Sequence, residues 1–238
     1  DEFHWIYDKV LTRDDVDFFQ TTYKDNPYLG EQTIKEIERL KEADENYWKV
    51  FGLGERGTSR TTIFTHWKEV EQVPEGWRLL AVGLDFGYTN DPTAIVKVFT
   101  DGHGYCLDEV CYSSGLLNTD ICNILRSAEI DKGDSIIADN AEPKSIAVIA
   151  SQGFNVHPCR KGPDSIRAGI DFMRSKPLMI TARSVNGIKE LRNYKYKEDR
   201  NQKALNTPVD AFNHFIDASR YAITFNQTNP NYGSYHLG

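Results

Sequence analysis

Three acidic residues stand at positions where a free carboxylate is hard to accommodate. Asp85 closes the apolar run 79–84, Asp139 closes the run 135–138, and Asp217 lies in a segment rich in Ala, Phe, Ile and Tyr. A charged group at the end of a buried strand is costly unless it is paired or binds a metal. We predict that the three carboxylates form one site for Mg²⁺ or Mn²⁺, because clustered carboxylates repel one another and these ions prefer oxygen ligands. Two such ions would activate a water and stabilise the leaving oxygen of a phosphodiester, so the predicted chemistry is phosphodiester hydrolysis.

A simpler interpretation of the same acids stays open. Asp139 could cap the helix that follows it, and Asp217 could pair with Arg220 three residues later. The sequence also leaves open whether Glu142 or Asp210 contributes to metal binding.

A histidine accompanies the third acid on a predicted helix over 208–224. Asp210, His214 and Asp217 are spaced i, i+4, i+7, which places them on one helical face. His214 is therefore expected at the rim of the carboxylate cluster, where it could orient the attacking water, bind a metal or protonate the leaving oxygen. The alternative is a structural histidine bonded to Asp210 on the helix surface.

These residues need a scaffold that brings distant segments together. Apolar and β-branched runs predict strands, and apolar spacing of three to four residues predicts helices. The predicted strands are 79–85, 94–99, 105–112, 135–139 and 155–158, and the predicted helices are 119–128, 143–152, 165–175, 184–194 and 208–224. Residues 194–200 form a polar excursion that reads as a hairpin. Three antiparallel strands followed by alternating helices and parallel strands resemble an RNase H-like α/β domain, a mixed sheet flanked by helices in which the first and fourth strands are neighbours.

The rest of the chain differs in composition from this domain. Residues 1–76 are expected to form an N-terminal appendage, 77–226 the RNase H-like domain, and 227–238 a loose tail rich in Asn, Gly and Ser. No G-x-x-x-x-G-K-[ST] phosphate loop occurs. No apolar run approaches the ~20 residues of a membrane span, so no membrane partner is expected. The four cysteines form no C-x-x-C pair, which argues against a zinc site.

Charge is distributed unevenly along the chain. The net charge is −7, yet residues 159–203 contain twelve Lys and Arg against five Asp and Glu, a local balance of +7. A basic segment in an acidic chain indicates a phosphate-binding face, although a solvated helical surface would have the same composition. The candidates for DNA binding lie outside the predicted helices and are Lys161, Lys195, Lys197 and Lys203.

Several motifs resemble the nuclease half of the large terminase subunits of tailed phages. They are L-D-F-G at 84–87, A-D-N-A-E-P-K-S-I at 138–146, K-G with S-I and G-I at 161–170, and N-H-F-I-D-A-S-R-Y-A at 213–222. Residues 22–29 are similar to the end of the same family's packaging ATPase.

The resemblance implies an endonuclease that cuts concatemeric viral double-stranded DNA during genome packaging. It implies that Asp85, Asp139 and Asp217 bind two Mg²⁺ or Mn²⁺ ions and that His214 is an auxiliary catalytic residue. In the whole protein it implies an ATPase domain, a small terminase subunit and a capsid portal as partners, acting in the host cytoplasm at the procapsid.

Two other classes of function compete with this one. The segment 84–89 also resembles the first phosphate loop of actin-like ATPases and sugar kinases, but Asp139 is followed by Asn-Ala-Glu, which is wrong for their second loop. A DNA-binding module with an inactive site is the other alternative, and the three retained acids count against it.

Overall fold

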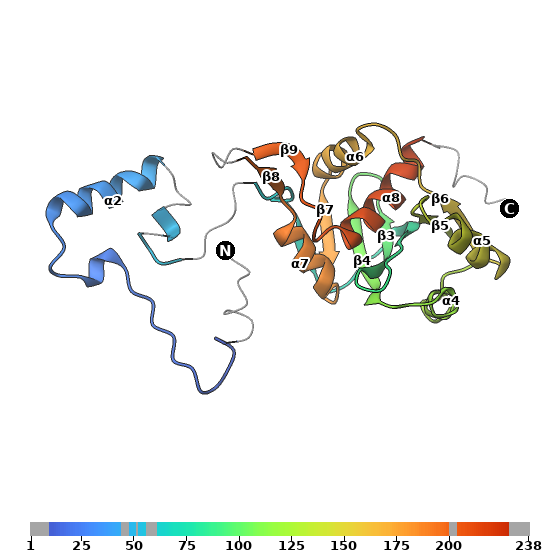
Figure 1. Ribbon diagram of the computed structural model, residues 1–238, viewed down its shortest axis with the longest axis horizontal. Helices are drawn as coiled ribbons and strands as arrows, with labels where there is room; N and C mark the ends of the chain where they lie inside the picture. Colours follow the sequence, from blue (N-terminus) through green and yellow to red (C-terminus); the bar gives the residue numbers. More distant parts are fainter. Residues whose placement is uncertain (1–9, 44–47, 51, 56–60, 200–203, 229–238) are drawn as a thin grey trace. The chain divides into compact units, whose positions relative to one another are not determined.

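The structure, a computed structural model, describes residues 10–43, 48–50, 52–55, 61–199 and 204–228 (Figure 1). The chain divides into two compact units, Asp1–Thr62 and Ile63–Gly238. In the first unit the 3₁₀-helix η1 (Tyr23–Asp25) is capped by Thr22 and precedes helix α2 (Glu31–Ala43). In the part of the chain that the structure describes, no helix is both long and apolar enough to span a bilayer.

The second unit is built on a seven-stranded mixed sheet in the order β1-β7-β4-β3-β2-β5-β6. The strands are β1 (Lys68–Val70), β2 (Arg78–Asp85), β3 (Pro92–Thr100), β4 (Tyr105–Ser114), β5 (Ser135–Ala138), β6 (Asn155–Pro158) and β7 (Leu178–Thr181). Strands β2, β3 and β4 pair antiparallel, whereas β5 and β6 continue the sheet in parallel beside β2. The predicted α/β class and the mixed RNase H-like sheet are therefore confirmed.

Two strands of this sheet were not predicted, and one of them, β1, changes where the domain begins. Strand β7 pairs in parallel with β4, and β1 pairs in parallel with β7. Ile63 and Phe64 are buried in the core, and the N–H of Ile63 donates to the carbonyl of Tyr194 at 2.9 Å. The compact unit thus starts at Ile63, earlier than the predicted start at residue 77, because a short polar edge strand has no apolar alternation to reveal it.

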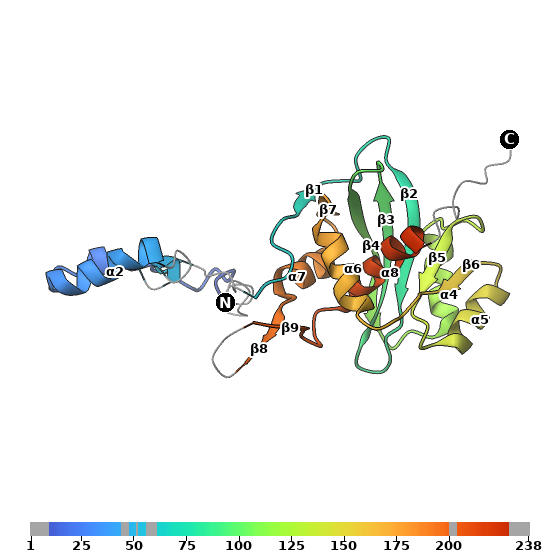
Figure 2. The same ribbon diagram turned by 90° about the horizontal axis from the view of Figure 1, so that it is seen from above.

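Helices cover both faces of this sheet. They are α4 (Asn118–Ser127), α5 (Pro143–Ser151), α6 (Ser165–Arg174), α7 (Val185–Asn193) and α8 (His214–Thr228). Helices α4 and α5 pack with Val82 and Leu84 on one face, and α6, α7 and α8 pack with Ala81 and Ala94 on the other. Figures 1 and 2 show α8 lying across the central strands, where it contacts β2, β3, β4 and β5.

Helix α8 lies unusually close to its neighbours. A Cβ atom on Gly83 of β2 would lie 1.9 Å from the carbonyl oxygen of Ala218. A Cβ on Gly187 of α7 would lie 2.6 Å from the Phe215 ring. A Cβ on Gly169 of α6 would lie 2.6 Å from Cδ of Arg220. Glycines on β2, α6 and α7 therefore allow these elements to contact α8 closely, because a side chain at any of the three positions would clash with it.

The predicted start of the last helix at residue 208 is wrong. Residues 204–208 form strand β9 (Ala204–Pro208), which pairs antiparallel with β8 (Tyr196–Glu198). The hairpin therefore extends beyond the predicted range 194–200, which contains only its first strand. Phe212 has φ +58°, a left-handed conformation that cannot continue a helix. Helix α8 begins only at His214, so Asp210 does not share a helical face with Asp217.

Candidate active site

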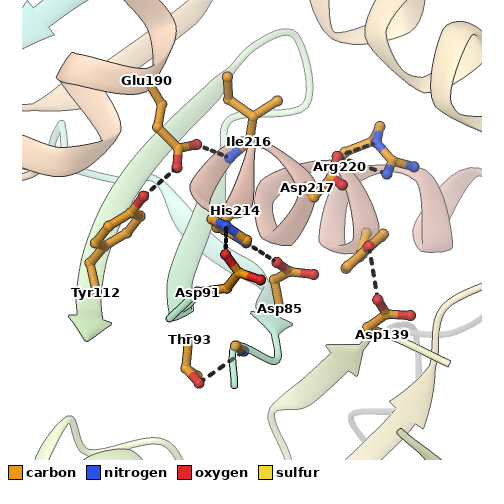
Figure 3. A network of polar contacts seen from close by, with 12 residues as sticks. Asp85, Asp91, Thr93, Tyr112, Asp139, Glu190, His214, Ile216, Asp217 and Arg220 are labelled. Carbon is orange, nitrogen blue, oxygen red and sulfur yellow. Dashed lines mark hydrogen bonds and ion pairs between the residues drawn. The ribbon is translucent and has the colours of Figure 1, made fainter. Parts of the chain in front are cut away.

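The backbone brings Asp85 and Asp139 to the same edge of the sheet. Strands β2 and β5 are parallel neighbours with Leu84 opposite Ala138, and the N–H of Asp139 extends the ladder to the Leu84 carbonyl at 3.0 Å. Side chains alternate along a strand, so Asp85 points to the same face as Gly83, the face that α8 covers. Asp217 precedes Ala218, which packs on Gly83, and Figure 3 shows the three carboxylates along one side of α8.

Asp85 is the most buried of the three acids, with 7% of its surface exposed. Its Oδ2 atom lies 2.9 Å from Nδ1 of His214, whose Nε2 lies 4.0 Å from Asp91 Oδ1 (Figure 3). Burial raises the pKa of Asp85, and Asp217 and Asp139 raise it further, while the bond to His214 opposes them. The pKa of His214 is raised chiefly by its hydrogen bond to Asp85. The carboxylates are close enough to repel one another.

Asp217 and Asp139 each have a cationic partner. Asp217 Oδ1 accepts hydrogen bonds from Arg220 at 2.8 and 3.2 Å, and Arg220 is only 3% exposed. Asp139 Oδ1 lies 2.6 Å from Lys161 Nζ and accepts the N–H of Ala141 at 2.9 Å. Of the two contacts in the simpler interpretation, the pair between Asp217 and Arg220 is present. Asp139 does not cap the helix that follows it: Glu142 is at the N-cap of α5, and the bond from Ala141 closes a turn before that helix.

The donor set fits a hard divalent cation in its chemistry. It offers carboxylate oxygens from three elements, one of them on a residue whose pKa is raised partly by the other two acids. Within the described residues, however, no three His, Cys, Asp or Glu side chains are gathered as ligands around one point. Lys161 and Arg220 supply the neutralising charge in this arrangement.

The sequence match decides the family. The family model described as "Terminase RNAseH like domain" matches residues 85–224, more than half of the chain. The chain belongs to this family. A second model, "Phage terminase large subunit", matches residues 1–55. The predicted terminase relationship is confirmed.

Relatives found by sequence agree with the terminase assignment. The chain is 32% identical over 220 residues to the large terminase subunit of Bacillus phage SPP1, an alignment that covers 85% of this chain and 50% of that protein. It spans about half the length of the curated relatives that it matches.

Solved terminase structures share the fold. The SPP1 large terminase nuclease domain, solved with bound Mn, has a TM-score of 0.61 at 24% identity, covering 68% of this chain and 98% of that one. The large terminase nuclease domain of P22 has a TM-score of 0.54 at 16% identity, covering 69% and 92%. At these identities the likeness establishes a terminase-type RNase H-like fold.

The other predicted residues lie at different places in the fold, and one of them lies next to the three acids. Lys161 lies against Asp139, on the loop between β6 and α6. Lys195 and Lys197 are exposed at the β8 end of the hairpin, outside the helices as predicted. Lys203 lies outside the described residues. Glu142 and Asp210 are exposed.

Two residues near the site were missed from the sequence. Glu190 of α7 is 1% exposed and lies against the first turn of α8, and Tyr112 of β4 donates its hydroxyl hydrogen to Glu190 at 2.8 Å (Figure 3). The sequence does contain an indication of Glu190: this acid lies between Ile188 and Leu191, on the apolar side of the predicted helix 184–194. Its partner could not be deduced, because the segments that meet there are far apart in the chain.

Proposed function

We propose that this chain contains a divalent-metal-dependent endonuclease domain that cuts double-stranded viral DNA during genome packaging. The observation that carries the proposal is the convergence of Asp85, Asp139 and Asp217 from β2, the end of β5 and α8. The likeness to an SPP1 nuclease domain that was solved with bound Mn supports it.

The three aspartates would hold Mg²⁺ or Mn²⁺, with two ions expected. Bound ions would supply an activated water and stabilisation of the leaving oxygen. Asp85 is held for this role by burial under α8, and Asp217 is fixed by the buried Arg220. Arg220 cannot retreat easily, because its stem is packed against Gly169.

Lys161 differs from Arg220 in its freedom to move. Its side chain is 40% exposed and belongs to a loop, so it can leave Asp139 without disturbing the core. We propose that Lys161 gives up Asp139 when a divalent ion binds and then contacts a DNA phosphate. Lys195 and Lys197 would bind further phosphates along the exposed hairpin.

His214 would act as an auxiliary catalytic residue. With Asp85 ionised, the proton on Nδ1 is held by the 2.9 Å hydrogen bond, so Nε2 is the atom left to accept or donate a proton. Asp91, 4.0 Å from Nε2, lies on the same side. This placement suits a residue that orients water or protonates the leaving oxygen.

The wider assembly follows from the family alone. We propose that the whole protein adds a packaging ATPase and works with a small terminase subunit and a capsid portal in the host cytoplasm. The match of residues 1–55 to the large-subunit family supports the ATPase part of this proposal.

Cleavage of supercoiled plasmid in Mn²⁺ tests the nuclease proposal. The unmodified chain is expected to cut, Asp139→Ala to be inactive, and Asp171→Ala, which changes an exposed acid on α6, to cut normally. Full activity of Asp139→Ala would contradict the metal-site assignment. DNA binding without any cleavage by the unmodified chain would instead favour an inactive DNA-binding module.

A further inference from the structure

A buried carboxylate holds the first turn of α8. Oε2 of Glu190 accepts the N–H of Ile216 at 3.0 Å. The first N–H groups of a helix have no partner within the helix, and a negative charge is favourable at that end. Glu190 therefore supplies from α7 the cap that the start of α8 needs.

The second oxygen of Glu190 is fixed by the sheet. Oε1 accepts the hydroxyl hydrogen of Tyr112 at 2.8 Å. Tyr112 of β4 stands opposite Ala94 of β3, and Ala94 stands opposite Asp85 of β2. Directly opposed residues point to the same face, so Asp85 and Tyr112 lie in one cross-strand row beneath α8, with the small Ala94 between them.

This row is joined to one helical turn at two points. Asp85 contacts His214 directly, and Tyr112 reaches Ile216 through Glu190. Burial raises the pKa of Glu190, so an unpaired carboxylate here would be costly, yet both of its oxygens are satisfied. These two attachments fix where the first turn of α8 lies over the sheet and how close to the sheet it lies.

We propose that Glu190 and Tyr112 are positioning residues that set His214 and Asp217 relative to Asp85. The inference rests on the proposed nuclease function for its catalytic consequence, but not for its structural part. Glu190 and Tyr112 contact no substrate in this scheme. They act through the backbone N–H of Ile216, which lies between His214 and Asp217.

The ring-nitrogen NMR signals of ¹⁵N-histidine-labelled protein, without metal, report the bond between His214 and Asp85. His214→Gln assigns the signals. Glu190→Ala and Tyr112→Phe are expected to shift the His214 signals. Glu190→Gln keeps an acceptor for the N–H of Ile216, so its His214 signals should lie closer to those of the unmodified protein. The matched control is Asp108→Asn. Asp108 is a second buried carboxylate, on β4, and it binds Arg183 and Thr181 and not α8.

Steady-state cleavage forms the second arm. Glu190→Ala should lower kcat about 10-fold or more with little change in KM, because small misplacement of catalytic groups is costly, and Asp108→Asn should not. If Glu190→Ala does not fold, Tyr112→Phe decides. The proposal would be overturned if the His214 signals were unchanged in both Tyr112→Phe and Glu190→Ala. In that case these variants would only lower the melting temperature, as Asp108→Asn does. If the unmodified chain fails to cut DNA, the nuclease proposal fails while the NMR arm still decides this one.

Discussion

Lys161 Nζ lies 2.6 Å from Oδ1 of Asp139, so a lysine occupies the place beside this carboxylate that a divalent ion would need. The amine and the ion would compete for one anionic oxygen. The predicted DNA-binding lysine is thereby linked to the predicted metal site.

Removing this lysine should strengthen metal binding. Lys161→Ala is expected to raise the affinity for Mn²⁺ in the absence of DNA by up to about 5-fold, the usual worth of a partly exposed ion pair. Isothermal titration calorimetry measures the change, and Lys195→Ala, an exposed lysine on the hairpin, should leave the affinity unaltered. Equal Mn²⁺ affinity in all three proteins would show that Lys161 does not compete.

The three acids should differ in their effect on stability, although each is expected to be needed for cleavage. Burial raises the pKa of the Asp85 carboxyl group, which means that its charged form is unfavourable in the folded protein. Asp85→Asn removes this charge, so the melting temperature without metal should stay level or rise. Asp217→Ala leaves Arg220 buried without its partner and should cost roughly 3 kcal/mol. Chemical denaturation compares the two, and a larger loss for Asp85→Asn than for Asp217→Ala would contradict this account.

His214 should matter for the rate rather than for DNA binding. His214→Ala is expected to cut at least ~10²-fold more slowly at saturating Mn²⁺, in line with the worth of a positioned acid or base, with little loss of DNA affinity. A purely structural role predicts near-normal cleavage with a lower melting temperature. The specific structural alternative, a bond to Asp210, is wrong, because His214 contacts Asp85 and Asp210 precedes the helix.

The hairpin lysines should bind DNA without regard to sequence. Lys195→Glu and Lys197→Glu are expected to weaken binding similarly for unrelated duplexes and to reduce the salt slope by about 1 for each DNA phosphate that the variant no longer neutralises. Fluorescence anisotropy at several salt concentrations measures both quantities. Lys132→Glu, an exposed lysine outside the basic segment, serves as the control. Unchanged affinity at low salt would mean that the hairpin is only a solvated surface.

The close seating of α8 can be tested with one methyl group. Gly83→Ala would place a Cβ 1.9 Å from the carbonyl oxygen of Ala218, and overpacking of this kind costs about 1–3 kcal/mol or more. We expect a lower melting temperature together with a loss of cleavage, because α8 carries His214 and Asp217. Gly133→Ala meets nothing within 4 Å and should leave both properties unchanged.

The sequence predicted most of the scaffold because local patterns determine it. The runs that end at Asp85 and Asp139 are apolar and β-branched, so both strands and their terminal acids could be read directly. Strand β1 is short and polar, and β7 has only four residues after Pro177, so neither carries a periodic signal.

The polar partners were harder to predict because they depend on packing. The left-handed conformation of Phe212 separates Asp210 from α8, although the spacing of the acids suits a continuous helix. The contacts of Lys161 with Asp139 and of Glu190 with Ile216 join segments that no pattern connects. A positive charge in a loop could be read as DNA binding, but its position against a carboxylate could not.

The bond between His214 and Asp85 joins residues 129 positions apart in the chain. Proteins are synthesised from the N-terminus and their domains fold as units, so the central strands leave the ribosome well before α8 does. During translation Asp85 and Asp139 are therefore synthesised before His214 and Asp217. The proposed nuclease site would therefore be incomplete in a nascent chain until α8 has been made and has docked.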